Sequence, residues 1–587
     1  METRTRSLVL ILAVVLLIRL PFLNQAIQGD DVNYLALAEH ALIDPLHPSH
    51  MQYVYQGDLV DARGHSHPPL NAWALALLLA AVGDIQEVPF HAAYLVFSLI
   101  AAAAMWSLAR RFSPRPLWAV LLFLAVPAFV VNGNSLETDV PHLAFWMAAA
   151  ALFCAGRWGL AAAAMALAAM TAYQAVFLTP ILWVYCWLYC RRNRAAWAAT
   201  LAPPAAILAY QLFERFSTGA LPASVLAGYL HTYNFQALPD KLRNAAAIAV
   251  HACFLVFPAL LPSAAVLAWR KRDRDTAFLA AWIGIFFAGA VAVFFSGAAR
   301  YLLPMAAPVA LLASRLRARW LAAGFAAQMA LSLGLAAANY EHWDGYRRFA
   351  RSLAPQAGRR RVWINGEWGL RYYLEADGGL PLRKAQMLNP GEIVVTSELA
   401  YPVEFTHPAA PLMTWEIRPA VPLRLIGLES RSGYSTASKG FLPFGISRGP
   451  VDRVRADLLV ERKPALEYLS MAEAEQLVTG LYSLEDHRWR WMARRGVVLL
   501  KSPPAPRPLQ VEFTIPAVSP VRSIEMQLDG RTVAAQSYAG PGSYTLASPP
   551  LAPSGPSATV TLIADRSFSV PGDRRDLSVI VTGVGFR

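Results

Sequence analysis

Charged residues are scarce in this chain. They make up 16% of its 587 residues, whereas a soluble domain carries about 25%. Hydrophobic residues make up 56%, and the mean hydropathy is +0.36. This deficit of charge, together with many long apolar runs, excludes an ordinary soluble protein and indicates an integral membrane protein. The formal net charge of +13 therefore fits the excess of Lys and Arg in cytoplasmic loops, and no nucleic acid is expected as a partner.

Cysteine is also scarce. The four cysteines all lie in apolar runs, without neighbouring residues of the kinds that bind zinc. This placement excludes a disulfide framework and predicts small buried hydrophobic side chains instead. The four are Cys154, Cys186, Cys190 and Cys253.

Long apolar runs are what the sequence has in excess, and they predict about eleven membrane spans, although some are shorter than the ~20 residues of a straight span. The first run has the basic start and short apolar core of a signal peptide, but Arg19 near its end and the acidic pair that follows favour a retained helix. The apolar stretch Asn71–Val82 is expected to be an interfacial helix. The predicted spans are Leu8–Leu23, Phe90–Leu108, Leu117–Val131, Val140–Ala155, Leu160–Thr171, Ala175–Leu188, Ala196–Phe213, Ala246–Trp269, Ala277–Phe295, Tyr301–Ala313 and Trp320–Ala338.

The basic clusters predict the orientation. With eleven spans, every cluster lies on one side, which the positive-inside bias makes the cytoplasm. The N-terminus is then cytoplasmic, and the loop 24–70 and the whole chain after residue 339 are extracytoplasmic. The clusters are Arg4 with Arg6, Arg110 with Arg111 and Arg115, Arg157, Arg191 with Arg192 and Arg194, Arg270 with Lys271, Arg272 and Arg274, and Arg315 with Arg317 and Arg319.

After the predicted membrane domain, residues 1–339, the composition changes. Residues 340–502 are predicted to form a small α/β domain, with strands at Arg361–Asn365 and Glu392–Thr396 around a helix at Gly366–Leu374. Pro503–Pro508 reads as a linker. Period-2 alternation from Leu509 onward predicts a β-sandwich over residues 503–587.

The polar stretch Gln28–Leu70 follows the first span and carries the adjacent acids Asp30 and Asp31. One interpretation is helix capping, because Asp is a common N-cap residue. The other is a general base for an acceptor hydroxyl, with a neighbour that orients the substrate or a metal.

Two histidines close the same stretch, directly before Pro68-Pro69. The prolines predict that His67 stands in an extended entry to the next helix. It is either an ordinary solvated histidine or a partner for a phosphate or a divalent metal. His65, His67 and Asp139 are the candidate ligands if a divalent metal such as Mg²⁺ or Mn²⁺ is a cofactor.

Two further motifs are expected on the same side. The short turn that carries Glu137 and Asp139 either caps the next helix or brings its acids level with the first loop, where they would repel one another unless a cation lies among them. Arg300 and Tyr301 begin the tenth predicted span. They fit interfacial snorkelling and an aromatic belt, or a phosphate site. Arg19 has the same two interpretations.

A carboxylate base, a cation and an apolar enclosure together suit a phosphate on a lipid tail. Attack by an acceptor hydroxyl on a sugar carried by polyprenyl phosphate needs a base for the proton and positive charge near the departing phosphate.

In their order and placement, these motifs resemble the GT-C superfamily of lipid-dependent glycosyltransferases, in particular the protein-mannosyltransferase-like and aminoarabinose-transferase-like enzymes of glycosyltransferase family 39. The resemblance covers Met1 to about Asp344. It implies a multi-span fold, an active site in the first loop and an inverting transfer from a polyprenyl-phosphate sugar to a glycan, lipid or protein acceptor in the bacterial inner membrane. The C-terminal sandwich is similar to the carbohydrate-binding-like ends of some bacterial glycosyltransferases.

Residue by residue, the resemblance implies the following roles. Asp30 matches the catalytic acid of the first loop, and Asp31 stands where many members have Glu. The remaining matches are His67, before Pro-Pro, toward the donor phosphate; Glu137 and Asp139 in the acidic turn; and Arg300 with Tyr301 near the lipid phosphate.

Two other functions compete with this hypothesis. A transporter or flippase of a lipid-linked sugar needs ionisable residues inside its spans, and the predicted spans here are nearly free of charge. A non-catalytic anchor for the C-terminal domains needs only one or two spans. The sequence therefore favours the glycosyltransferase.

Overall fold

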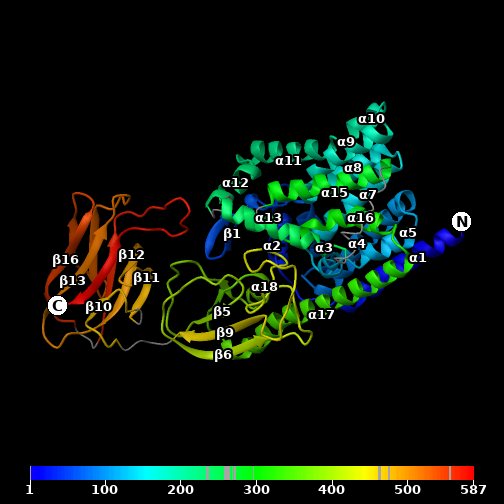
Figure 1. Cartoon of the computed structure of the whole chain (residues 1–587). Coiled ribbons are helices and arrows are strands. Elements are labelled where there is room, and N and C mark those ends of the chain that lie inside the picture. The colour runs from blue at the N-terminus through cyan, green and yellow to red at the C-terminus, as the bar shows by residue number, and fades with distance from the viewer. Residues whose placement is uncertain are drawn as a thin grey trace.

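The computed structural model describes residues 2–232, 237–256, 265–266, 269, 273–294, 297–459, 464–473, 476–553 and 557–587. Much of the predicted span Ala246–Trp269 and most of the basic cluster after it lie outside these residues. The described residues form a helical unit, an α/β domain and a C-terminal β unit, which follow one another along the chain (Figure 1).

The helical unit is built for a membrane. Among the described residues, five helices are long and apolar enough to cross one, and four shorter apolar helices accompany them. The chain is thus a multi-pass α-helical membrane protein, as predicted, while the count of eleven spans stays a prediction. The helices are α1 (Glu2–Arg19), α2 (Asp31–Ile43), α3 (Leu70–Val82), α4 (Glu87–Phe112), α5 (Pro116–Leu124), α6 (Pro127–Asn132), α7 (Asp139–Cys154), α8 (Trp158–Thr171), α9 (Leu178–Tyr189), α10 (Arg194–Ala199), α11 (Ala202–Thr218), α12 (Pro222–Thr232), α13 (Leu238–Ala252), α15 (Arg274–Val293), α16 (Leu303–Ala313) and α17 (Ala318–Ala357).

Proline divides one predicted span. Leu117–Val131 is two helices, because Pro127 has no N–H to continue α5 and its fixed φ suits the first turn of α6. The short helix α6 leads directly into the acidic turn before α7. Helix α7 packs between α4 and α8, with Trp146 and Phe153 fully buried. All four cysteines are unpaired, but only Cys186 is buried as predicted, whereas Cys154 and Cys190 are partly buried and Cys253 is exposed.

The α/β domain has a five-stranded sheet in the order β4-β3-β5-β9-β6, parallel where β3 meets β4 and β5 and antiparallel elsewhere. Helix α17 runs for 40 residues from the helical unit into this domain. The boundary predicted at 339/340 therefore falls inside a helix, whose buried Tyr346 and Phe349 pack in the domain core. The elements are β3 (Val362–Asn365), α18 (Trp368–Ala376), β4 (Leu380–Pro381), β5 (Ile393–Ser397), β6 (Ala409–Ile417) and β9 (Asp452–Leu459).

The C-terminal β unit is one nine-stranded sheet that encloses its own core. The end strands β15 and β16 lie next to one another, so the sheet is nearly closed. Strand β10 pairs with β18, and β12 pairs with β17. The unit therefore begins just before Tyr468, and not at the predicted boundary of 502/503. The proline-rich segment joins two strands of this sheet. The strands are β10 (Tyr468–Ser470), β11 (Leu477–Glu485), β12 (Trp489–Lys501), β13 (Arg507–Ile515), β14 (Ser523–Leu528), β15 (Arg531–Ser537), β16 (Gly542–Leu551), β17 (Ser557–Ala564) and β18 (Ile580–Phe586).

Candidate active site

Arg300 lies at the centre of the predicted acidic residues. Its Nη2 is 3.0 Å from Oδ2 of Asp30, in the first loop, and its Nη1 contacts Oε2 of Glu137. Oδ2 of Asp139 is 3.5 Å from the same Nη1. The three carboxylates come from the first loop, from the turn before α7 and from the first residue of α7, and the guanidinium comes from the short helix before α16. The cation that the acidic turn requires is therefore this arginine.

The three carboxylates differ in exposure. The side chain of Asp30 is 35% exposed, whereas those of Glu137 and Asp139 are each 6% exposed. Glu137 also accepts a hydrogen bond from the backbone N–H of Asp30 at 3.0 Å. Gly29 has a φ of +46°, and a Cβ there would stand 2.5 Å from the Glu137 carboxylate. Glycine thus lets the buried acids approach the first loop, and Asp30 alone of the three is substantially exposed.

Asp31 makes different contacts from its neighbour Asp30. Its carboxylate is fully buried and accepts hydrogen bonds from the Ser135 hydroxyl at 2.9 Å, from the Leu136 N–H at 2.8 Å and from the Gln28 N–H at 3.1 Å. Burial raises the pKa of Asp31, while these hydrogen bonds oppose the rise. Asp31 joins the first loop to the acidic turn. Asp30 occupies the N-cap position of α2 but makes no capping hydrogen bond with its side chain.

The predicted histidines and Tyr301 border the cluster. Tyr34 of α2 lies 2.9 Å from Nδ1 of His67 and 3.2 Å from the hydroxyl of Thr138. Burial lowers the pKa of His65 and lowers that of His67 well below its ordinary value, which favours the neutral form of both rings. The ring of Tyr301 lies 5.2 Å from the Arg300 guanidinium. The structure thus places every predicted site residue around one centre.

Two of the three candidate metal ligands are already engaged by other side chains. Nδ1 of His67 is engaged by Tyr34 and Ser66, and Asp139 is engaged by Asn132 and Arg300. In the part of the chain that the structure describes, no group of three His, Cys, Asp or Glu side chains is arranged to hold a metal ion. The donor set around Arg300 instead suits a guanidinium.

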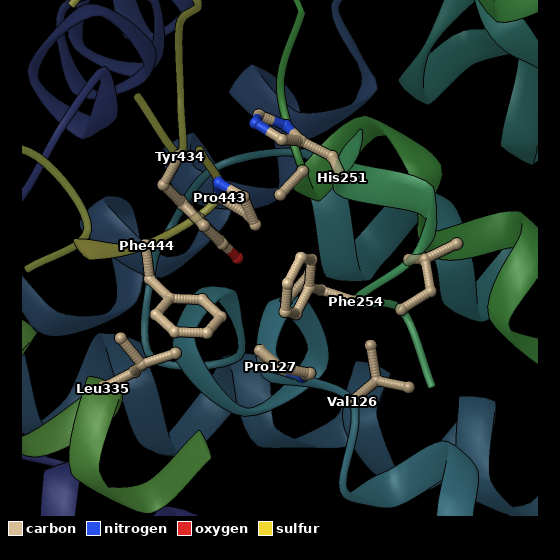
Figure 2. Close-up of a pocket in the computed structure, with 11 residues that line it drawn as sticks. Val126, Pro127, His251, Phe254, Leu335, Tyr434, Pro443 and Phe444 are labelled. Atoms are coloured by element: carbon tan, nitrogen blue, oxygen red, sulfur yellow. The ribbon is translucent and has the colours of Figure 1, made fainter. Parts of the chain in front are cut away.

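The sequence did not predict two residues that support the cluster around Arg300, Asn132 and Tyr434. The Asn132 amide donates to Asp139 at 3.2 Å and accepts a hydrogen bond from the Tyr434 hydroxyl. Tyr434 belongs to an irregular segment of the α/β domain, and its carbonyl accepts from the N–H of Ala299, next to Arg300. Figure 2 shows Tyr434 beside Phe254 and Phe444 in the small apolar pocket at this junction. Asn132 directly follows a predicted span, but no signal in the sequence points to Tyr434.

A second set of missed contacts ties the first loop to α17. Asn339 of α17 donates to the Gln28 side chain at 2.6 Å, and Gln28 donates to the Asn134 carbonyl at 2.9 Å. Arg19 lies nearby but does not reach an exposed surface. Only 2% of it is exposed, and it donates to the carbonyls of Phe129 and Val130 at the end of α6. Arg19 therefore supports the helix before the turn.

One known protein family is similar to part of the chain. Residues 66–210 match the model of the family described as dolichyl-phosphate-mannose-protein mannosyltransferase. That range contains His67, Glu137 and Asp139. No curated protein matches the sequence.

Several solved structures are similar to this chain at low identity. ArnT from Cupriavidus metallidurans bound to undecaprenyl phosphate is 14% identical with a TM-score of 0.43, over 66% of this chain and 93% of that chain. The arabinofuranosyltransferase AftD from Mycobacteria is 13% identical with a TM-score of 0.41, over 99% of this chain and 58% of that chain. The S. cerevisiae protein O-mannosyltransferase Pmt1-Pmt2 complex bound to the sugar donor is 15% identical with a TM-score of 0.28, over 37% of this chain and 34% of that chain. The family match thus bears out, over residues 66–210, the predicted resemblance to the glycosyltransferases of the protein-mannosyltransferase type.

Proposed function

We propose that this protein transfers a sugar from a polyprenyl-phosphate donor to an acceptor hydroxyl, with inversion at the anomeric carbon and Asp30 as the general base. The observation that carries the proposal is the asymmetry around Arg300, where Asp30 is a third exposed and the other two carboxylates are buried. A partly exposed carboxylate beside a buried guanidinium is suited to take a proton from an incoming hydroxyl. The family match over residues 66–210 supports glycosyl transfer.

The reaction forms one bond and breaks one. The acceptor oxygen bonds to the anomeric carbon of the sugar, and its proton passes to Asp30. The bond between the anomeric carbon and the phosphate oxygen breaks, and the phosphate leaves with the electron pair on its lipid tail. No further reactant is needed.

Arg300 is the group suited to the departing phosphate. Glu137 and Asp139 hold its Nη1, while Asp30 holds its Nη2. We propose that the donor phosphate takes the position of Asp30 on Nη2, which frees that carboxylate to face the acceptor. A guanidinium there stabilises the negative charge that develops on the phosphate. His67 and Tyr301 border this position as further donor contacts.

The proposed location is the extracytoplasmic face of a bacterial inner membrane, with the N-terminus in the cytoplasm. The distribution of basic clusters supports this orientation. The acceptor is a glycan, a lipid or a protein. A flippase is the competing function, and it would move the lipid-linked sugar without cleaving the bond to phosphate.

The test is release of sugar from a panel of radiolabelled polyprenyl-phosphate sugars by the purified full-length protein in nanodiscs. We expect one donor to be consumed, and Asp30→Asn to lower its turnover by about 10²- to 10⁴-fold, the range typical of a general base. If both proteins leave the donor intact, and the wild type in proteoliposomes of the same lipids moves the donor across the bilayer, the protein is a flippase instead.

Two control variants separate chemistry from structure. Asp44→Asn makes the same change in the same loop, where Asp44 pairs with His47 and not with Arg300, and should keep full turnover. Asp31→Asn should lower thermal stability together with turnover, because Asp31 joins the loop to the turn. Asp30→Asn should leave stability nearly unchanged. Equal loss of stability in both variants would contradict the assignment of Asp30 as the base.

A further inference from the structure

The hydroxyl of Tyr34 joins three segments of the candidate active site. Tyr34 lies in the first turn of α2, where its backbone N–H donates to the Asp30 carbonyl at 3.4 Å. The residue is only 4% exposed. Its hydroxyl oxygen is 2.9 Å from Nδ1 of His67 and 3.2 Å from the hydroxyl oxygen of Thr138. One buried side chain thus connects the helix after Asp30, the segment that enters α3 and the acidic turn.

Thr138 contributes its hydroxyl to this connection and not to the cap of its own helix. It stands at the N-cap position of α7 and is 2% exposed. A threonine at this position usually accepts a hydrogen bond from an N–H in the first turn of the helix, but the side chain of Thr138 makes no such bond. A buried hydroxyl that lacks a partner is costly. The contact with Tyr34 therefore gives the Thr138 hydroxyl the partner that it needs.

His67 is oriented by hydroxyl groups at one of its two ring nitrogens. Its Nδ1 lies 2.9 Å from the Tyr34 hydroxyl and 3.0 Å from the Ser66 hydroxyl. The ring of His65 packs beside it, with centroids 5.4 Å from that of His67 and 5.0 Å from that of Tyr34. Pro68 restricts the backbone of His67 as well. A flip of the ring would place a carbon where Nδ1 lies and would lose both hydrogen bonds, so the two nitrogens have fixed and different surroundings.

The direction of the hydrogen bonds decides which nitrogen carries the proton. A neutral imidazole has a proton on one nitrogen and a lone pair on the other. When the Thr138 hydroxyl donates to Tyr34 and the Tyr34 hydroxyl donates to Nδ1, each hydroxyl proton is used once. Nδ1 is then the acceptor, and Nε2 carries the proton. In this tautomer Nε2 is a hydrogen-bond donor, whereas the reverse tautomer would leave on Nε2 a lone pair that repels a phosphate oxygen.

The acidic turn holds both groups that the proposed function assigns to the donor phosphate. The acids on either side of Thr138 hold the guanidinium of Arg300. Thr138 itself reaches His67 through the Tyr34 hydroxyl. Three successive residues of one turn thus set the positions of the guanidinium and of the imidazole together.

We propose that Tyr34 is a positioning residue for the donor phosphate. With Thr138 it holds His67 in the tautomer that carries the proton on Nε2, and that N–H donates to a phosphate oxygen beside Arg300. A neutral donor stabilises the phosphate without placing a second cation against the guanidinium. The inference rests on the function proposed above for the identity of the phosphate as the sugar donor, but its test needs no turnover.

The probe is a tritium-labelled polyprenyl phosphate without a sugar, titrated with the full-length protein in detergent. Tyr34→Phe removes only the hydroxyl, and we expect it to weaken probe binding about tenfold, the effect of losing one hydrogen bond to a charged group. Tyr185→Phe is the matched control. Tyr185 is 5% exposed, and its hydroxyl donates to the Cys154 carbonyl at the other end of α7. This variant should bind the probe as the wild type does.

Variants of His67 show whether Tyr34 acts through the imidazole. Glutamine places its amide nitrogen near the position of Nε2, whereas asparagine places it near the position of Nδ1. His67→Gln should therefore retain most of the probe affinity, and His67→Asn should lose it as Tyr34→Phe does. Adding Tyr34→Phe to His67→Gln should have little further effect, because an amide N–H needs no hydroxyl to fix its tautomer. A Tyr34 that only stabilises the fold would weaken binding in both backgrounds.

Three results would overturn the proposal. They are unchanged binding in Tyr34→Phe, an equal loss from Tyr34→Phe in the wild-type and His67→Gln backgrounds, and tighter binding in His67→Asn than in His67→Gln. If His67→Gln does not fold, Thr138→Val takes its place. Because Thr138 and Tyr34 act along one chain of hydrogen bonds, the double variant should bind no more weakly than Tyr34→Phe alone, and two effects that multiply would overturn the proposal.

The positioning role and the proposed function fail separately. Probe binding that depends on Tyr34 through His67, in a protein that consumes no donor, would leave the positioning role standing and remove the proposed function. Turnover that depends on Asp30, with probe binding that is the same in the wild type and Tyr34→Phe, would do the reverse.

Discussion

Arg300 and Asp30 are 270 positions apart in the chain, yet their side chains form a hydrogen-bonded ion pair of 3.0 Å. The pair joins the first loop to the start of α16. Glu137 and Asp139 share the same guanidinium from the other side. One cation therefore holds three carboxylates, two of which are buried, and its removal has consequences for both folding and activity.

We expect Arg300→Ala to lower the free energy of unfolding by about 3–5 kcal/mol, because it leaves buried carboxylates without their partner. Thermal unfolding in detergent measures this loss. Adding Glu137→Gln to Arg300→Ala should restore part of the stability but none of the turnover. Arg418→Ala is the control, since Arg418 is 54% exposed in its pair with Glu416 and such pairs contribute about 0–1 kcal/mol. A similar loss in both single variants would contradict the central role of Arg300.

Tyr434→Phe removes the hydroxyl that donates to Asn132. Stability should fall by about 1 kcal/mol, the usual net value of one hydrogen bond. Turnover should also fall several-fold, because Asn132 orients Asp139. Steady-state kinetics of donor consumption checks this expectation. Tyr544→Phe removes a hydroxyl that donates to the Gly540 carbonyl in the C-terminal unit, and it should leave turnover unchanged.

Gly133 has no side chain, and the guanidinium of Arg19 occupies the space that a side chain there would fill. A Cβ at this glycine would stand 1.8 Å from the guanidinium carbon of Arg19. Gly133→Ala should therefore displace Arg19 from the end of α6 and lower stability by at least the roughly 1–3 kcal/mol of an overpacked core. Gly159, inside α8, has no atom within 4 Å of its Cβ position, and Gly159→Ala should be neutral or slightly stabilising. Equal melting temperatures for the two variants would refute this account.

Asp452 is expected to make the stability of the α/β domain depend on pH. It accepts hydrogen bonds from the Tyr346 hydroxyl at 2.8 Å and from the Leu399 N–H at 2.9 Å. Burial raises the pKa of Asp452 from 3.8 to about 6. Since the folded state binds the proton more tightly than the unfolded state, the native protein should gain stability as pH falls from 6 to about 4.

Relative to Asp452→Asn, this gain should approach about 3 kcal/mol and should be absent above pH 6, where the carboxyl is ionised in both states. Denaturant unfolding of both proteins between pH 4 and 7 measures the difference. A difference that grows with rising pH would show that the carboxyl is stabilised in its ionised form instead.

The residues that meet around Arg300 could be predicted from the sequence, because their motifs recur at the same ends of successive apolar runs. The division of labour between Asp30 and Asp31 could not. Adjacent residues at the start of a helix point about 100° apart, and only the position of the acidic turn decides which of the two is buried. Tyr434 could not be predicted either, since it reaches the site from an irregular segment without periodicity.

The fold shows the same limits. Apolar runs predicted the helical unit, and alternating strands predicted the C-terminal β unit. The boundary near Pro503 was misplaced because a proline-rich segment can join two strands of one sheet as well as two domains. The boundary near residue 339 was misplaced because α17 continues as an amphipathic helix after its apolar part ends.

Because α17 is continuous, its length determines how the α/β domain is rotated about the helix axis relative to the helical unit. A helix of 40 residues is about 60 Å long, and each added residue turns its far end by about 100°. One residue inserted before Asn339 would therefore carry the Asn339 amide away from Gln28 and would rotate Tyr434 away from Asn132. The number of residues in this helix is thus itself a condition for assembling the site, although few of its side chains lie there.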